Sequence, residues 1–132
     1  DGTVRCWGQN GDGQLGDGTI IDSSLPETVN GLSSALQVIA GTAHTCAHRG
    51  DGTVRCWGRN TYGQLGDGTT SDSTAPVVTS NLSDVVAVAA GSSHSCAMRS
   101  DGTARCWGRN HHGQLGDGTT SDSTVPVGVQ SF

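Results

Sequence analysis

The sequence has 132 residues and no lysine, so its seven basic side chains are all arginines. Twelve acidic residues outnumber them, and the formal net charge is −5. A nucleic-acid-binding protein needs a concentrated basic patch, which scattered arginines in an acidic chain do not supply. We therefore expect no direct nucleic-acid partner.

Apolar residues are also scarce, at 33% of the chain. The longest apolar run, Val85 to Ala90 with its flanks, is only as long as a strand, and nothing predicts a membrane span. Glycine, by contrast, occurs 21 times, a density typical of turns that need positive φ. No segment shows helical periodicity, so the composition predicts an all-β chain of short strands and tight turns.

One motif occurs three times without insertion or deletion. The string Asp-Gly-Thr-x-Arg-Cys-Trp-Gly-x-Asn-x-x-Gly-Gln-Leu-Gly-Asp-Gly-Thr begins at Asp1, at Asp51 and at Asp101. A repeat of this length is a supersecondary unit that cannot bury its own apolar face and must stack on its neighbours.

Each repeat has the pattern of four antiparallel strands. In the second repeat they are expected at 36–40, 44–48, 53–57 and about 75–79. The innermost strand is the most apolar and the outermost contains Pro76, which suits a sheet edge. This pattern predicts β-propeller blades. A β-solenoid is the alternative, although its repeats are usually shorter.

The turn between the second and third strands sets the cysteine register. An x-Asp-Gly loop predicts a type I turn followed by a G1 bulge, with Gly52 in the left-handed region. Non-hydrogen-bonded positions then bring cysteines opposite each other, where a disulfide fits. The predicted pairs are Cys46 with Cys56 and Cys96 with Cys106, and Cys6 stays unpaired because its partner would lie ten residues earlier.

Zinc is the competing interpretation of these cysteines. His44, Cys46 and His48 alternate onto one strand face with Cys56 across from them, and all are zinc-ligand types. The next copy places Met98 where His48 stands, so it loses one ligand. Repeated disulfides in a glycine-rich chain with little core favour an oxidising compartment instead.

The second half of one repeat and the start of the next carry a family resemblance. This part of the sequence resembles the repeat of the regulator of chromosome condensation family. It reads Val-x-x-Ala-Ala-Gly-x-x-His-[Ser/Thr]-Cys-Ala, followed by Asp-Gly-Thr-x-Arg-Cys-Trp-Gly-x-Asn. The resemblance implies a seven-bladed propeller when the array is full. The cysteine-containing form is similar to repeats of bacterial secreted or surface proteins.

The blade frame divides the chain unevenly. We expect residues 1–29 to form the outer half of a blade, and 36–79 and 86–129 to form complete blades. Seven such blades would need roughly 350 residues. The chain is thus expected to be about two and a half blades of a longer propeller, with both ends covered by the same propeller or by neighbouring subunits.

Two residue types recur at positions that suit packing between blades. Trp7, Trp57 and Trp107 end their strands on the face opposite the cysteine and are predicted to fill the space between adjacent blades. A rim position used for ligand stacking is the alternative. His44 and His94 are predicted to pack as well, since His44 lies opposite Gly58 in the hairpin.

Candidate contact residues are those that differ between copies of an otherwise fixed motif. They are Gln9, Asp12, Arg59, Tyr62, Arg109, His111 and His112. Loops on a rigid scaffold commonly bind partners, although unconstrained surface variation predicts the same pattern.

Carboxylates and possible catalytic groups give weaker signals. The pairs Asp17/Asp22, Asp67/Asp72 and Asp117/Asp122 could hold calcium, but turn capping is the favoured explanation, because Asp-Gly is the commonest turn sequence. No nucleophile, base and orienting group are expected to meet. We expect no enzyme activity, no cofactor and no metal.

The sequence as a whole favours a secreted or surface-displayed scaffold, bacterial extracellular or periplasmic, that binds a protein or glycan. One alternative is a structural component of an extracellular filament. Another, from the resemblance alone, is guanine-nucleotide exchange. That activity depends on a wedge-like insertion, which the uniform period leaves out, and on a reducing compartment, which paired cysteines do not fit.

Overall fold

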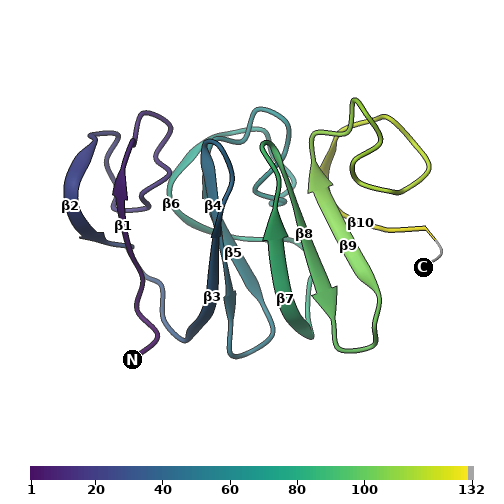
Figure 1. Ribbon diagram of the computed structural model, residues 1–132, viewed down its shortest axis with the longest axis horizontal. Helices are drawn as coiled ribbons and strands as arrows, with labels where there is room; N and C mark the ends of the chain where they lie inside the picture. The colour runs from purple at the N-terminus through teal and green to yellow at the C-terminus, as the bar shows by residue number, and fades with distance from the viewer. Residues whose placement is uncertain (131–132) are drawn as a thin grey trace.

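The computed structural model describes residues 1–130 and contains only strands as regular elements in that range. They are β1 (Arg5–Gly8), β2 (Ser23–Thr28), β3 (Ala35–Ala40), β4 (His44–Arg49), β5 (Val54–Gly58), β6 (Ser73–Val78), β7 (Val85–Ala90), β8 (His94–Arg99), β9 (Ala104–Gly108) and β10 (Ser123–Gly128). Figure 1 shows the strands grouped along the long axis, with β1 and β2 at one end and β9 and β10 at the other.

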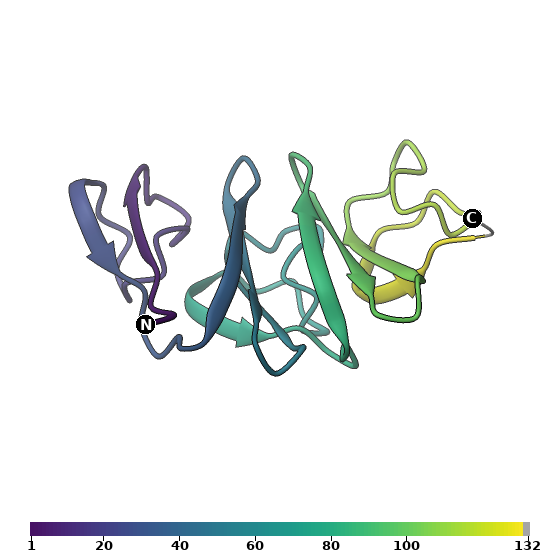
Figure 2. The same ribbon diagram turned by 60° about the horizontal axis from the view of Figure 1, so that its bottom comes forward.

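The strands form three antiparallel sheets, each a simple meander. β1 pairs with β2, the second sheet has the order β3-β4-β5-β6, and the third has the order β10-β9-β8-β7. Figure 2 shows the three sheets arranged one after another, from the N-terminal to the C-terminal end. The predicted all-β class and the four-stranded antiparallel blades are confirmed.

The predicted hairpin register is also found. Cys46 lies opposite Cys56, and Ala47 lies opposite Arg55. Gly52 has a φ of 81° and donates its N–H to the carbonyl of Arg49 at 3.0 Å. A positive φ is unfavourable for a residue with a Cβ but not for glycine. Gly52 therefore fixes the turn, and the turn fixes which side chains lie opposite each other on β4 and β5.

The outermost strand differs slightly from its prediction. β6 begins at Ser73, two positions before Ala75, because Ser73 pairs with Gly58 beyond an irregularity in the ladder. Pro76 lies in this edge strand, as predicted from its missing N–H. Proline at this position prevents a regular ladder with another chain.

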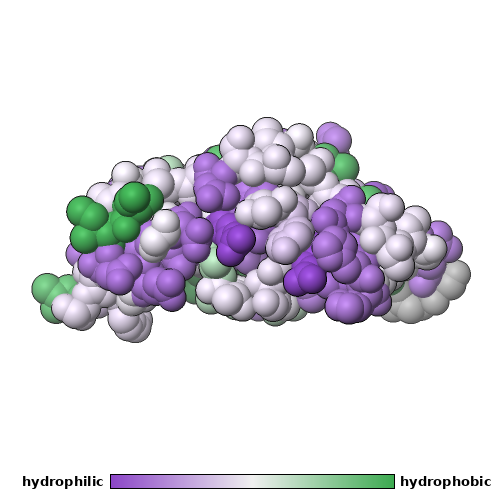
Figure 3. Space-filling model, turned by 90° about the horizontal axis from the view of Figure 1, so that it is seen from above, coloured by the Kyte–Doolittle hydropathy of each residue, from purple (hydrophilic) through white to green (hydrophobic). Residues whose placement is uncertain are grey.

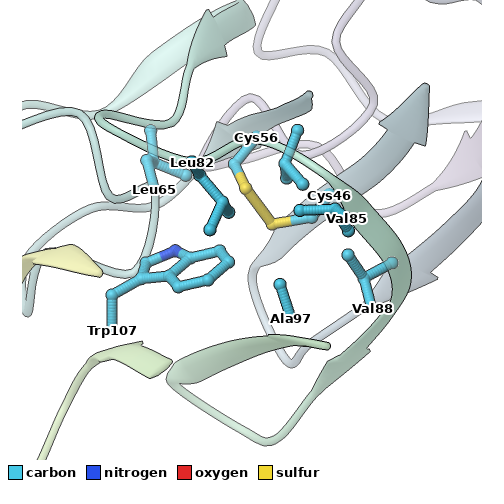
Figure 4. Close-up of a cluster of buried hydrophobic side chains, with 9 residues drawn as sticks. Cys46, Cys56, Leu65, Leu82, Val85, Val88, Ala97 and Trp107 are labelled. Atoms are coloured by element: carbon cyan, nitrogen blue, oxygen red, sulfur yellow. A yellow bond between two sulfur atoms is a disulfide. The ribbon is translucent and has the colours of Figure 1, made fainter. Parts of the chain in front are cut away.

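The apolar core lies between the sheets. Between the second and third sheets, the Cys46–Cys56 pair faces the indole of Trp107, with aliphatic side chains around them (Figure 4). The aliphatic members are Val54, Leu65, Leu82, Val85, Val88 and Ala97. A smaller cluster around Trp57 joins the first sheet to the second. Each sheet is therefore held mainly by its neighbour, as expected for stacked repeats.

The three tryptophans do not share one environment. Trp57 and Trp107 are fully buried, and each donates its indole N–H to a backbone carbonyl of the preceding repeat, Gln14 and Gln64 respectively, at 2.9 Å. Trp7 is 62% exposed, so the predicted packing is wrong for this copy. Within residues 1–130 no repeat precedes the first sheet, so nothing covers Trp7 in the way that the preceding loops cover Trp57 and Trp107.

Candidate functional site

Long loops joining the third and outer strands of each sheet gather at one end of the molecule, at the top of Figure 1. They cover residues 9–22, 59–72 and 109–122. All seven predicted contact residues lie in these loops, so we treat this loop face as the candidate site.

A buried asparagine organises each loop. The side-chain amide of Asn60 donates to the carbonyls of Thr69 and Ser71 at 2.9 and 3.0 Å. Its side-chain oxygen accepts the N–H of Leu65 at 2.9 Å. Asn60 is fully buried, and buried amides are retained in folds when their donors and acceptors are satisfied in this way. Asn10 and Asn110 make the same bonds in their own loops.

The paired aspartates serve the same loops. Asp72 accepts the backbone N–H of Asn60 at 2.8 Å, and Asp67 accepts the N–H and hydroxyl of Thr69 at 3.0 and 2.8 Å. These are the capping bonds of the turn interpretation. Among residues 1–130, no three His, Cys, Asp or Glu side chains gather as metal ligands.

Variable residues of two neighbouring blades meet at the loop face. The guanidinium of Arg109 lies over the Tyr62 ring, 5.0 Å from its centroid. The ring of His111 meets Tyr62 edge-on, with centroids 5.7 Å apart. Cation–π and edge-to-face contacts of this kind are favourable at partly exposed sites. Tyr62 therefore joins its own blade to the next one.

Hydrogen bonds order the same cluster further. Arg109 Nε donates to His111 Nδ1 at 3.3 Å, and His111 Nε2 lies 3.4 Å from an Asp122 carboxylate oxygen. The arginine Nε is thereby engaged within the loop. The two terminal nitrogens of the Arg109 guanidinium make no hydrogen bond or ion pair within residues 1–130. They are therefore able to donate hydrogen bonds to a partner.

The remaining contact candidates lie apart from this cluster. Arg59 donates from Nε to the Thr61 hydroxyl at 3.1 Å. The backbone N–H groups of Asp12 and His112 each donate to the side-chain oxygen of the glutamine two residues later, and His112 is exposed. Gln9 is exposed and lines a cavity beside the first sheet. The structure thus joins Tyr62, Arg109 and His111 and leaves the other four separate.

One of the two recurring histidines, His44, lies between two blades. His44 is 1% exposed, and its Nε2 is 2.8 Å from the Ser95 hydroxyl of the next blade. Burial, with a smaller contribution from the nearby His94, lowers the pKa of His44 to about 4. Burial also lowers the pKa of His94. A neutral imidazole bonded to a hydroxyl of the next blade acts as a packing element at His44.

The cysteines form two bridged pairs and one free thiol in residues 1–130. Cys46 is joined to Cys56 and Cys96 to Cys106, with Cα–Cα distances of 4.1 Å in both pairs. With both sulfurs bonded to each other, the zinc set loses its thiolates. Cys6 is free and half-buried, and burial raises the pKa of its thiol.

A cavity of about 240 Å³ lies beside Cys6. It is lined by β1, by the loop of the first repeat and by β3 and β4, with Cys6, Trp7 and His44 among the lining side chains. In the second sheet, the position beside β5, the equivalent of β1, is taken by β4, which pairs with β5 and whose His44 bonds to Ser95 of β8. No helix in residues 1–130 has the length and hydrophobicity to span a bilayer.

Sequence reasoning missed the asparagine of each loop. Asn10, Asn60 and Asn110 recur at a fixed place in the motif, which was the available signal. Asparagine in a glycine-rich stretch normally indicates an exposed turn. Its burial depends on carbonyls nine and eleven residues away, and local pattern does not reveal such long-range bonds.

Comparison with protein families gives consistent matches. The model described as "Regulator of chromosome condensation (RCC1) repeat" matches residues 1–48, 51–98 and 101–132. A second RCC1 repeat model matches residues 37–64 and 85–114. A search of curated protein sequences found no significant match.

Two solved structures resemble the chain over nearly its whole length. Human WBSCR16 has a TM-score of 0.87 and 26% identity, covering 99% of this chain and 36% of its own. Prp20p from Saccharomyces cerevisiae, described with its binding to Gsp1p and histones, has a TM-score of 0.84 and 24% identity, covering 98% of this chain and 34% of its own. The chain therefore spans about a third of the length of both structures.

Proposed function

The chain belongs to the regulator of chromosome condensation (RCC1) repeat family, and from that premise we propose that it is a non-enzymatic scaffold, secreted or displayed on a cell surface, which binds a protein or glycan through its loop face. It acts as about two and a half blades of a longer, seven-bladed propeller. The observation that carries the proposal is the cluster of Tyr62, Arg109 and His111.

That cluster supports binding because its side chains differ between repeats while the loop backbone that carries them stays the same. The loops share the buried asparagine, so their backbones have one conformation, while the side chains on them differ between repeats. A rigid backbone limits the entropy lost when a partner orders the loop. Tyrosine and arginine are also the side chains most enriched where interfaces concentrate their energy.

The bridged cysteines support an extracellular or periplasmic setting. Both pairs close a hairpin with a sequence separation of 10 residues, and disulfides persist chiefly in oxidising compartments. A guanine-nucleotide exchange role, by analogy with relatives that bind small GTPases, has less support, since the uniform repeat contains no inserted wedge.

A structural role in an assembly has its own supporting observation. Trp7 is exposed, Cys6 is free, and a cavity of about 240 Å³ lies between them and the second sheet. These features leave the first sheet ready to receive further repeats, either from the same propeller or from a neighbouring subunit.

Binding measurements with loop variants test the scaffold proposal. The wild-type chain and a Tyr62→Asp, Arg109→Gln variant, which carries the first repeat's residues at both positions, are compared on glycan and extracellular-protein arrays. We expect targets of the wild type to lose at least about tenfold in affinity, as for residues that dominate an interface, with unchanged unfolding. An unchanged set of targets contradicts binding through the loop face.

A second measurement separates the scaffold from the assembly. Electron microscopy and sedimentation of native material report whether the chain occurs in regular polymers. If polymers form and the loop variant binds all targets normally, stacking itself is the function.

A further inference from the structure

The first repeat departs from the other two along its outer strand and the loop before it. It carries Ile20 and Ile21 where the other copies carry a threonine and a serine, namely Thr70, Ser71, Thr120 and Ser121. It also carries Leu25 where they have Ala75 and Val125, and the chain's only glutamate, Glu27, where they have Val77 and Val127.

These apolar side chains are turned to solvent. Ile20 is 63% exposed, and Ile21 and Leu25 are each 70% exposed. In Figure 3 a hydrophobic cluster stands on the hydrophilic surface at the end of the molecule that holds the first sheet. Contiguous exposed apolar groups rimmed by polar ones are typical of interaction sites rather than of ordinary surface.

The fold does not require the two isoleucines. The carbonyl of Ile21 accepts the amide of Asn10 at 3.1 Å, and the carbonyl of Ser71 does the same for Asn60 at 3.0 Å. The loop bond is therefore made by the backbone, whichever side chain is present. The other two repeats have threonine and serine at these positions and form the same loop. Folding therefore does not require isoleucine at either position.

Carboxylates lie beside one of these apolar side chains, Ile21. Asp17, Asp22 and Glu27 line a hollow of about 260 Å³, together with Thr19, Ile21 and Ser23. Glu27 accepts the Ser23 hydroxyl at 2.8 Å. Within residues 1–130 none of the three carboxylates takes part in an ion pair. Their negative charge is thus uncompensated by the chain itself.

We propose that this outer patch, made of Ile20, Ile21 and Leu25 with Asp17, Asp22 and Glu27, binds a segment of a partner protein that is both apolar and basic. Charge complementarity selects the occupant, because lysine or arginine beside apolar residues satisfies both parts of the patch. The proposal rests on the scaffold function and gives it a partner chemistry.

The mode of contact follows from the strand. Pro26 follows Leu25 in β2 and lacks an N–H, so an added strand cannot form a regular ladder along this edge. The partner segment is therefore held by side chains in the hollow and over the isoleucines. An anionic membrane surface is disfavoured, since it would face the carboxylates.

The test uses two short peptides with the same leucines, flanked by lysines in one and by glutamates in the other. Binding to residues 1–132 is followed by backbone amide shifts in NMR. The lysine peptide should shift amides within 17–27 and weaken as salt is raised. The patch variant is Ile20→Thr with Ile21→Ser, and the charge variant is Glu27→Val. Both variants replace residues of the first repeat by those at the same positions of the other two repeats.

The patch variant should lose at least about tenfold in affinity, as expected from removing exposed apolar area that binding buries. The charge variant should bind the lysine peptide more weakly and lose much of the preference over the glutamate peptide. A Tyr62→Asp, Arg109→Gln control should bind the lysine peptide normally, so failure here is distinguishable from failure of the loop face.

Three results would overturn the proposal. The lysine peptide fails to bind saturably, it binds the patch variant as well as the wild type, or both peptides bind the wild type equally. Vesicles of phosphatidylglycerol that bind the wild type through Ile20 and Ile21 more tightly than the peptide does would also overturn it, in favour of a lipid surface.

Discussion

The indole N–H of Trp57 donates to the backbone carbonyl of Gln14 at 2.9 Å, across the boundary between two sheets. Gly16 lies beneath the same indole, where an added Cβ would come within 2.7 Å of Trp57 Nε1. Each tryptophan thus needs both a free carbonyl and a missing side chain in the repeat before it. The stacking of blades depends on this match between two loop residues and one strand residue.

Replacing Trp57 by alanine should lower the free energy of unfolding by about 3–5 kcal/mol, as for other large aromatics removed from a core. Denaturant unfolding followed by circular dichroism measures this. Trp7→Ala is the matched control, because Trp7 is 62% exposed in the same motif position. A loss below about 1 kcal/mol for both variants would show that inter-blade packing does not depend on the indole.

Asn60→Asp should destabilise the second loop by about 2–3 kcal/mol. The aspartate keeps an oxygen for the Leu65 N–H but cannot donate to the carbonyls of Thr69 and Ser71, and buried acceptors left without donors are costly. Hydrogen exchange of the loop amides and thermal unfolding measure the effect. The exposed Asn30→Ala serves as control, and equal stabilities for the two variants would exclude the organising role.

Stability should fall as pH drops from about 6.5 toward 4. Burial lowers the pKa of His44 from 6.5 to about 4, so in this window the unfolded chain binds a proton that the folded chain does not. The contribution is complete above pH 6.5, and about 1.4 kcal/mol is lost per pH unit within the window, roughly 3 kcal/mol in all. The lowered pKa of His94 acts in the same direction.

The pH dependence is measured by denaturant unfolding at each pH. A His44→Gln variant should show a shallower slope, whereas His112→Gln, at an exposed site, should keep the wild-type slope. A proton NMR titration places the His44 transition directly. A transition near 6.5 in the folded protein would contradict the predicted effect of burial.

The two disulfides should differ in resistance to reduction. Cys46 and Cys56 are both fully buried, whereas Cys96 is only half-buried. Under native conditions a mild reductant should therefore open Cys96–Cys106 first, as read by alkylation and mass spectrometry. In denaturant both should open at the same rate. Loss of one bridge should cost about 2–3 kcal/mol, since the closed loop is short.

The parts predicted correctly from sequence depend on local geometry. The x-Asp-Gly turn fixes the hairpin, and the hairpin places Cys46 opposite Cys56, so a short pattern was sufficient. Repetition then extended the result along the chain. The burial of Trp57 also followed from its strand position, whereas Trp7 at the same motif position is exposed.

The parts not predicted depend on contacts between repeats. The contact of Tyr62 with Arg109 joins residues of neighbouring blades, and their separation depends on how the blades stack. The outer patch was not recognised because Ile20 and Ile21 look like the start of an ordinary buried strand. Only the structure places them in a loop held by its backbone and turned to water.

The bond from tryptophan to glutamine carbonyl also restricts the symmetry of any assembly built on it. The donor always belongs to the later repeat and the acceptor to the earlier one, for Trp57 with Gln14 and for Trp107 with Gln64. Such a contact is heterologous, and two identical faces cannot satisfy it by a two-fold axis. Units joined through this bond add in one direction only. Such an assembly either closes into a ring or continues as a filament.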